Sequence, residues 1–153
     1  MHAIVSGAAG AATLTLTHEI VRQLVPGAPR LDKLGMQSLA AMLRFAGVTP
    51  PRGDRLRGVT LAGDLLANTL YFAPVASARH VSLLRGVMVG VAAGLGAVFL
   101  TPALGLAKRH RGVTVGGKLL TVGLYALGGL ATAAMSRALR MSSPQGASRV
   151  IPS

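Results

Sequence analysis

The stretch that decides the fold is RLRGVTLAGDLLANTLY at residues 55–71, which occurs again in altered form as RHRGVTVGGKLLTVGLY at residues 109–125. Ten of the seventeen positions are identical, and the alignment needs no gap. Each copy starts with an Arg-x-Arg-Gly motif and continues as an apolar segment. A match this close predicts that one structural unit is used twice, so its length and polarity constrain the architecture of the whole chain.

The chain carries too little charge for an ordinary soluble protein. Only 13% of its 153 residues are charged and 51% are hydrophobic, whereas about a quarter of a soluble domain is charged. Glycine is abundant, with 20 residues, and glycine is common in membrane helices because it lets their backbones approach closely. The composition therefore predicts an all-α integral membrane protein.

Apolar runs long enough to cross a bilayer predict the number of spans. Three clear runs cover residues 58–77, 86–107 and 113–135, each near the ~20 residues that a spanning helix needs. A weaker run at residues 3–17 reaches that length only if it continues through His18 and Glu19 to Leu24. A signal peptide and an interfacial helix are the alternatives for this first run, although a signal peptide would begin with basic residues. We predict a four-span helical bundle.

The net charge of +12 reflects basic residues that cluster at the ends of the apolar runs. In a four-span arrangement eleven Lys and Arg residues lie on one side and five on the other, and the richer side is normally cytoplasmic. Both Arg-x-Arg-Gly motifs are then cytoplasmic and both termini lie outside. If the first run does not span, the N-terminus lies inside. We expect an integral protein of the bacterial inner (cytoplasmic) membrane.

The arginines of the two motifs are expected to contact the anionic headgroups of membrane lipids, because they stand where the spans enter the cytoplasmic surface. They are Arg55, Arg57, Arg109 and Arg111. No DNA- or RNA-binding signature accompanies the basic residues, so nucleic acid is not an expected partner.

Residues 31–47 differ from the spans. They are too short to cross a bilayer, and prolines stand on both sides of them, at Pro29 and Pro50. Their apolar residues follow helical spacing, which predicts an amphipathic helix lying on the cytoplasmic interface. The alternative is a short helix packed on the loops. Residues 142–153 are polar and predict a C-terminal tail.

The repeat predicts one transmembrane domain, residues 1–141, built from two parallel hairpins. The first hairpin covers residues 1–78, with the helix at 31–47 inserted in its connection, and the second covers residues 84–141. Both matched segments enter from the cytoplasm, so the units are related by an axis along the membrane normal. The alternative is convergence of two unrelated segments on a common membrane-entry sequence.

Small residues on the first and third apolar runs predict close helix packing. Gly86, Gly90 and Gly94 share one helix face, and such a groove marks a contact in lipid. Ser6 and Gly10 occupy the positions of the first run that correspond to Gly90 and Gly94. We therefore expect these two runs to cross closely; the alternative is that the groove faces another copy of the protein.

A polar cluster is predicted in the cytoplasmic third of the bilayer. The repeat aligns Asp64 with Lys118, Asn68 shares the face of Asp64, and Glu19 lies near the cytoplasmic end of the first run. A charge at the centre of a bilayer costs ~2.5–3.5 kcal/mol, so such groups normally face inward and find partners. We predict an ion pair between Asp64 and Lys118 that fixes helix register. The alternative is a site for an ion or small polar solute.

Motifs of soluble enzymes are incomplete in this chain. The glycine-rich segment at 112–118 resembles a phosphate loop, but Leu119 replaces the required Ser or Thr. His18-Glu19 begins a zinc-protease pattern, but Arg22 stands in place of the second His, and there is no Cys. We therefore expect no enzyme activity, cofactor or metal. The favoured function is that of a structural or accessory membrane subunit, either a homo-oligomer or part of a larger complex. The alternative is a small transporter or channel.

Overall fold

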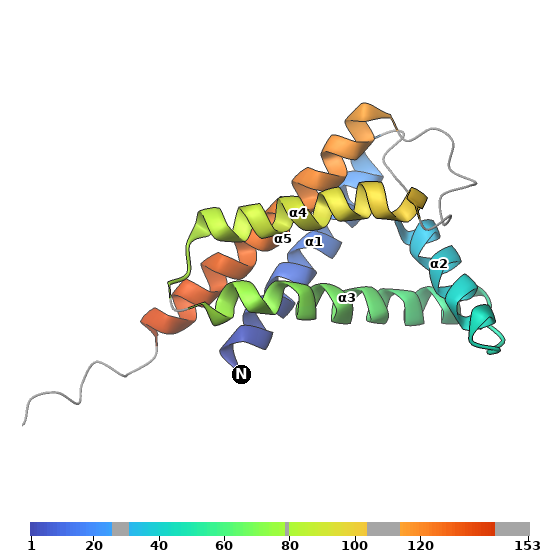
Figure 1. The fold of residues 1–153 in the computed structure, drawn as a ribbon, viewed down its shortest axis with the longest axis horizontal. Coiled ribbons are helices and arrows are strands. Elements are labelled where there is room, and N and C mark those ends of the chain that lie inside the picture. Colours follow the sequence, from blue (N-terminus) through green and yellow to red (C-terminus); the bar gives the residue numbers. More distant parts are fainter. Residues whose placement is uncertain (26–30, 79, 104–113, 143–153) are drawn as a thin grey trace, which may run out of the picture.

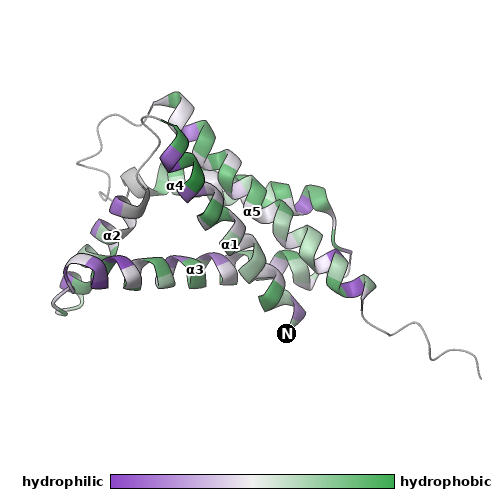
Figure 2. Ribbon diagram, turned by 180° about the vertical axis from the view of Figure 1, so that it is seen from behind, coloured by the Kyte–Doolittle hydropathy of each residue, from purple (hydrophilic) through white to green (hydrophobic). Residues whose placement is uncertain are grey.

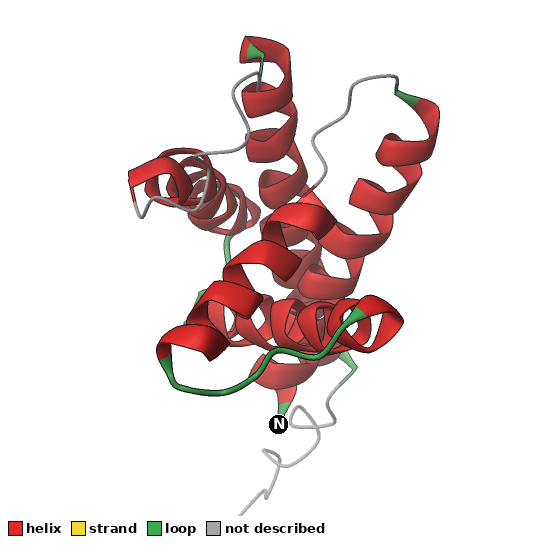
Figure 3. Ribbon diagram, turned by 90° about the vertical axis from the view of Figure 1, so that its right-hand side faces the viewer, coloured by secondary structure: helices red, strands yellow, loops and turns green. Residues whose placement is uncertain are grey.

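The computed structural model describes residues 1–25, 31–78, 80–103 and 114–142, and all regular structure in these ranges is α-helical (Figure 3). Four of the helices are long and apolar enough to cross a membrane, which confirms the predicted all-α class and agrees with a membrane protein. The five helices are α1 (His2–Leu24), α2 (Leu31–Phe45), α3 (Gly53–Ser77), α4 (Leu83–Ala103) and α5 (Val115–Met141).

The helices extend beyond the apolar runs that predicted them. α1 continues through His18 and Glu19 to Leu24, so the first run does reach the length of a span. α3 begins at Gly53 rather than at residue 58, so the first Arg-x-Arg-Gly motif is helical. Because helical hydrogen bonds do not depend on side-chain polarity, a helix continues into its polar flanks until a terminating residue stops it.

Helix α5 is the central element of the bundle (Figure 1). It packs against α1, α3 and α4, while α1 also packs closely on α3. Helices α1 and α4 run in one direction, and α3 and α5 run in the other. Within the described residues α1 and α4 do not touch, so the predicted close crossing of the first and third runs is wrong. Both of these helices instead place small residues against α5.

The glycines of α4 bring its backbone onto that of α5. A Cβ atom added to Gly90 would lie 2.7 Å from the Ala126 Cα, and one added to Gly94 would lie 2.6 Å from the Val122 Cα. Gly86 faces Gly129 in the same contact. No side chain larger than hydrogen fits at these positions without moving the neighbouring helix. The glycine face of α4 is therefore a packing surface in the structure, and the helix that it meets is α5.

The small residues of α1 are divided between two neighbours. A Cβ atom on Gly10 would lie 3.2 Å from the Thr132 Cβ of α5, and one on Gly7 would lie 3.1 Å from the Ala73 backbone nitrogen of α3. Ser6 is fully buried, and its hydroxyl donates to the His2 carbonyl at 2.8 Å. Helix α1 thus packs against both α3 and α5 through its small residues.

The apolar core is small and lies where α1, α3 and α5 meet. It consists of Leu14, Phe72 and Leu124, with Val21, Leu120 and Tyr125 packed around it. The Phe72 ring rests on Gly128, whose added Cβ would be 3.1 Å from two ring atoms. The absent side chain at residue 128 therefore creates the space that the ring fills.

Arg140 fastens the end of α5 to the end of α3. Its guanidinium group donates to the carbonyl oxygens of Ala76 and Ala78 at 2.8 and 2.7 Å. These carbonyls stand at the C-terminus of α3, where backbone acceptors have no partner within the helix and where a positive charge is favourable.

We expect Arg140→Gln to lower the free energy of unfolding by about 1–2 kcal/mol, because two charge-assisted hydrogen bonds at an exposed position are lost. The measurement is unfolding of the protein in detergent by SDS, followed by circular dichroism. Arg137→Gln is the matched control, since Arg137 is exposed on the same helix, three residues before Arg140. Equal losses for the two variants would show that the charge, and not the contact with α3, is responsible.

Helix α2 lies apart from the bundle and contacts only α3 among the described helices (Figure 1). Its Gly35 faces the Thr60 methyl group, and Ala40 is buried. Met42 and Phe45 are exposed. The helix ends at Phe45, two residues before the predicted end, because Gly47 adopts a left-handed φ of 74° in the turn that follows. The placement of α2 on a membrane interface stays a prediction.

Polar and apolar residues are unevenly distributed over the helices. Figure 2 shows hydrophobic residues along α4 and α5, and a concentration of hydrophilic ones on α2 and the adjoining end of α3. That end carries the predicted cytoplasmic arginines Arg55 and Arg57, both exposed. Arg109, Arg111 and the tail beyond Ser142 lie outside the described residues.

Candidate intramembrane polar site

Asp64 and Asn68 stand one turn apart on α3, on the side that faces α1. The Asn68 amide and the His18 imidazole of α1 both lie within electrostatic range of the Asp64 carboxyl group. Tyr125 of α5 also lies within that range. Asn68 itself is buried. Polar groups of α1 and α5 thus lie within electrostatic range of the Asp64 carboxyl group on α3.

Asp64 is nevertheless open to the surroundings of the protein. Its residue is exposed, as are Leu61, Gly63 and Leu66 on the same half of α3. The reason is that α3 extends past α1 and α5 at its N-terminal end (Figure 1), where α2 is its remaining neighbour. A carboxyl group therefore stands on a face that is otherwise apolar.

The predicted ion pair between Asp64 and Lys118 is not formed. Both residues are described and exposed, and no ion pair joins them. Helices α3 and α5 meet through their C-terminal halves, where Phe72 contacts Gly128 and Arg140 contacts Ala76. Their N-terminal halves diverge (Figure 1). Equal depth in the membrane, which the sequence predicted, does not bring the two charges together.

Glu19 finds its partner on its own helix. Arg22, three residues later, donates to the Glu19 carboxylate, with Nε 3.0 Å from Oε2, and Gln23 Nε2 lies 3.2 Å from Oε1. Arg57 of α3 is within electrostatic range of the same carboxylate. Glu19 is thereby neutralised locally and does not join Asp64 and Lys118. A functional role for Glu19, Asp64, Asn68 and Lys118 as one set stays a prediction.

Thr15 is a polar residue that sequence reasoning missed. Its hydroxyl oxygen is buried and has no hydrogen-bond partner within the described part of the chain. By contrast, the Thr13 hydroxyl donates to the carbonyl oxygen of Ala9, four residues earlier, at 2.8 Å, as threonine hydroxyls in helices commonly do.

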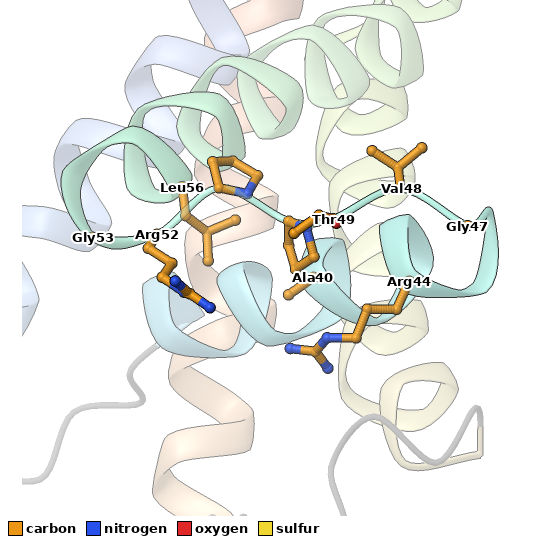
Figure 4. A pocket seen from close by; sticks show the side chains of 10 residues that line it. Ala40, Arg44, Gly47, Val48, Thr49, Arg52, Gly53 and Leu56 are labelled. Atoms are coloured by element: carbon orange, nitrogen blue, oxygen red, sulfur yellow. The ribbon is translucent and has the colours of Figure 1, made fainter.

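A concave region lies between α2 and the start of α3. This pocket has a volume of about 600 Å³ and opens to the outside. Its lining includes two arginines, Arg44 and Arg52, and the first turn of α3 (Figure 4). Both arginines belong to the eleven basic residues of the predicted cytoplasmic side, but their spacing in the sequence did not predict that they border one pocket. The left-handed turn at Gly47 that brings residue 52 back toward α2 was not foreseen.

The described residues hold no group of three His, Cys, Asp or Glu side chains close enough to bind a metal ion. No protein-family model, curated protein or solved structure matches the chain.

Proposed function

We propose that this protein is a small, non-enzymatic integral membrane protein that acts as a structural or accessory subunit through close helix packing. The observation that carries the proposal is the large apolar surface that the chain leaves uncovered. On α4 the glycine face is used against α5, whereas Leu84, Met88 and Phe99 are exposed. Lipid chains can cover such side chains, and so can the helices of a partner.

The exposed half of α3 favours a protein partner over lipid alone. Acyl chains solvate Leu61 and Leu66 well, but they cannot hydrogen-bond or neutralise the Asp64 carboxyl group. Lys118 is likewise exposed near the start of α5. A second copy of the chain, or a subunit of a larger complex, can supply the missing partner for each charge. Arg55 and Arg57 would then contact anionic headgroups of the bacterial inner membrane at the cytoplasmic end.

The packing also supports a duplicated hairpin. Gly7 of α1 sits against α3 between Thr69 and Ala73, and Gly90 of α4 sits against Tyr125 of α5. The repeat aligns Tyr125 with Tyr71, the midpoint of the α3 contact. Each hairpin is thus closed by a glycine at the same level of its second helix. By this measure Gly7, and not Ser6, is the counterpart of Gly90.

The subunit proposal is tested by isolating the protein in a mild detergent and measuring the mass of the particle and the chains that copurify. We expect more than one protein chain per particle. We expect Asp64→Asn to reduce the assembled fraction, because an exposed carboxylate would lose its partner. Asp54→Asn is the control, since Asp54 is exposed in the first turn of the same helix. A single-chain particle with no copurifying protein would refute the proposal.

A second function, a small ion or solute transporter or channel, is favoured by one observation. Asp64 stands one helical turn from Asn68 and within electrostatic range of His18, so a polar ligand would find a carboxyl, an amide and an imidazole there. In proteoliposomes, Asp64→Asn would then abolish flux while leaving the helical content unchanged. Flux through the purified protein without any partner chain would decide for transport, and absence of flux from an intact complex would decide for the subunit.

A further inference from the structure

The pocket between α2 and α3 is built by a sharp reversal of the chain. Residues 46–52 lead from the end of α2 to the start of α3, and Gly47 and Gly53 have left-handed φ angles of 74° and 56°. Pro50 and Pro51 stiffen the connection between them. The wall of the pocket therefore has a fixed shape. Its lining consists of Ala40, Arg44, Gly47, Val48, Thr49, Pro50, Pro51, Arg52, Gly53 and Leu56.

Two guanidinium groups border this pocket without a carboxylate between them. Figure 4 shows the side chains of Arg44, from α2, and Arg52, from the connection, extending to the same side and toward one another. Within the described residues neither guanidinium group makes an ion pair, since the pair observed there joins Arg22 to Glu19. Asp54 is the nearest acidic residue in sequence and does not line the pocket. Two like charges that converge on one space favour an anion in it.

The start of α3 adds donors at the same place. Arg52 is the N-cap residue and forms no side-chain hydrogen bond to the first turn, and Gly53 and Leu56 of that turn line the pocket. The backbone N–H groups of a first helical turn have no partner within the helix and carry a partial positive charge. They reinforce the field of the two arginines, which remain the principal feature of the pocket.

We propose that this pocket binds a phosphate group, held by Arg44 and Arg52. Guanidinium groups match the oxygen spacing of phosphate and can each donate two parallel hydrogen bonds, which lysine cannot do. Exposed Val48 lines the pocket, and Met42 and Phe45 are exposed on α2 on either side of Arg44 in the sequence. They suit a ligand whose phosphate continues into apolar chains, as in an anionic phospholipid, while a free phosphate would engage the arginines alone.

The identification of the ligand as a phospholipid rests on the membrane insertion proposed above. The binding of a phosphate group by Arg44 and Arg52 does not depend on it. The test uses the full chain in a neutral detergent, titrated separately with short-chain phosphatidylglycerol, short-chain phosphatidylcholine and inorganic phosphate. Bound ligand is counted by native mass spectrometry. The variant is Arg44→Gln with Arg52→Gln, and the control is Arg85→Gln with Arg137→Gln. The control removes the same charge from exposed positions in the first turn of α4 and near the end of α5.

We expect the Arg44/Arg52 variant to bind the phosphate-bearing ligand about tenfold or more weakly, as loss of charge-assisted hydrogen bonds implies, and the control to bind like the wild type. Binding of phosphatidylglycerol that inorganic phosphate does not displace identifies a lipid, whereas binding of inorganic phosphate itself identifies a free phosphate. Equal weakening of both double variants, or no saturable binding of either probe, would overturn the proposal.

A measurement on the wild type makes the result independent of how the variants fold. Phenylglyoxal modifies exposed arginines, and peptide mass spectrometry reads each position. The bound ligand should protect Arg44 and Arg52 but not Arg85 or Arg137, and uniform protection would count against the site. Failure of this test leaves the particle mass unaffected, so it is distinguishable from failure of the subunit proposal.

Discussion

Replacing Gly90 by alanine is expected to weaken the contact between α4 and α5, whereas the same change at Gly96 is expected to leave stability unchanged or raise it. The added methyl group at residue 90 would stand 2.7 Å from the Ala126 Cα, which is backbone and cannot rotate away. Overpacking of this kind costs about 1–3 kcal/mol. At Gly96 nothing lies within 4 Å, and alanine favours the helix by about 0.5–1 kcal/mol over glycine.

The two variants form a matched pair because they make the same chemical change on one helix. Both variants are unfolded by SDS in mixed micelles and followed by circular dichroism. The free energy of unfolding should be lower than that of the wild type for Gly90→Ala, and equal or higher for Gly96→Ala. Leucine at both positions would enlarge the difference, since only residue 90 faces a neighbouring backbone. If Gly90→Ala and Gly96→Ala proved equally stable, the close approach of α4 to α5 would be refuted.

Phe72→Ala should cause the largest loss of stability of any single truncation. Phe72 is 0% exposed, and its ring fills the space between Leu14, Leu124 and Gly128. Removal of a buried aromatic ring leaves a cavity and costs about 3–5 kcal/mol in water-soluble cores. In a bilayer the transfer component is smaller, and the lost packing contacts remain, so we expect about 3 kcal/mol here.

Phe99→Ala is the control, because Phe99 is 66% exposed on α4 and loses little contact within the chain. Its effect on the free energy of unfolding should stay within about 0.5 kcal/mol. Both variants are measured by the same SDS unfolding assay. Similar losses for Phe72→Ala and Phe99→Ala would mean that the junction of α1, α3 and α5 is not the core of the protein.

The sequence predicted the helices better than it predicted their partners. Apolar run length identified the four helices that are long and apolar enough to cross a membrane, and a first helix of that length had to continue to Leu24. Four-residue spacing identified the packing face of Gly86, Gly90 and Gly94. It could not say that the face meets α5, because helical periodicity fixes a direction around one axis and carries no information on which helix lies there.

The polar residues show the same limit. Their depth along each helix follows from residue counting, which placed Asp64 and Lys118 in one layer. Their separation depends on how far α3 diverges from α5, and this is set at the other end of the helices by Phe72, Gly128 and Arg140. Arg44 and Arg52 converge because Gly47 and Gly53 adopt left-handed φ angles in the connection between α2 and α3. The spacing of the two arginines in the sequence does not show this reversal of the chain. Local patterns do not reveal such long-range geometry.

The central position of α5 has a consequence for the order of assembly. A polypeptide emerges from the ribosome N-terminus first, so α1 and α3 can pair as soon as both are in the membrane. Helix α4 makes no contact with α1 and only a small one with α3. Until α5 is inserted, the glycine face of α4 would therefore be covered by lipid alone. Helix α5 follows α4 in the chain and packs against α1, α3 and α4, so its insertion joins α4 to the pair of α1 and α3 in a single folded unit.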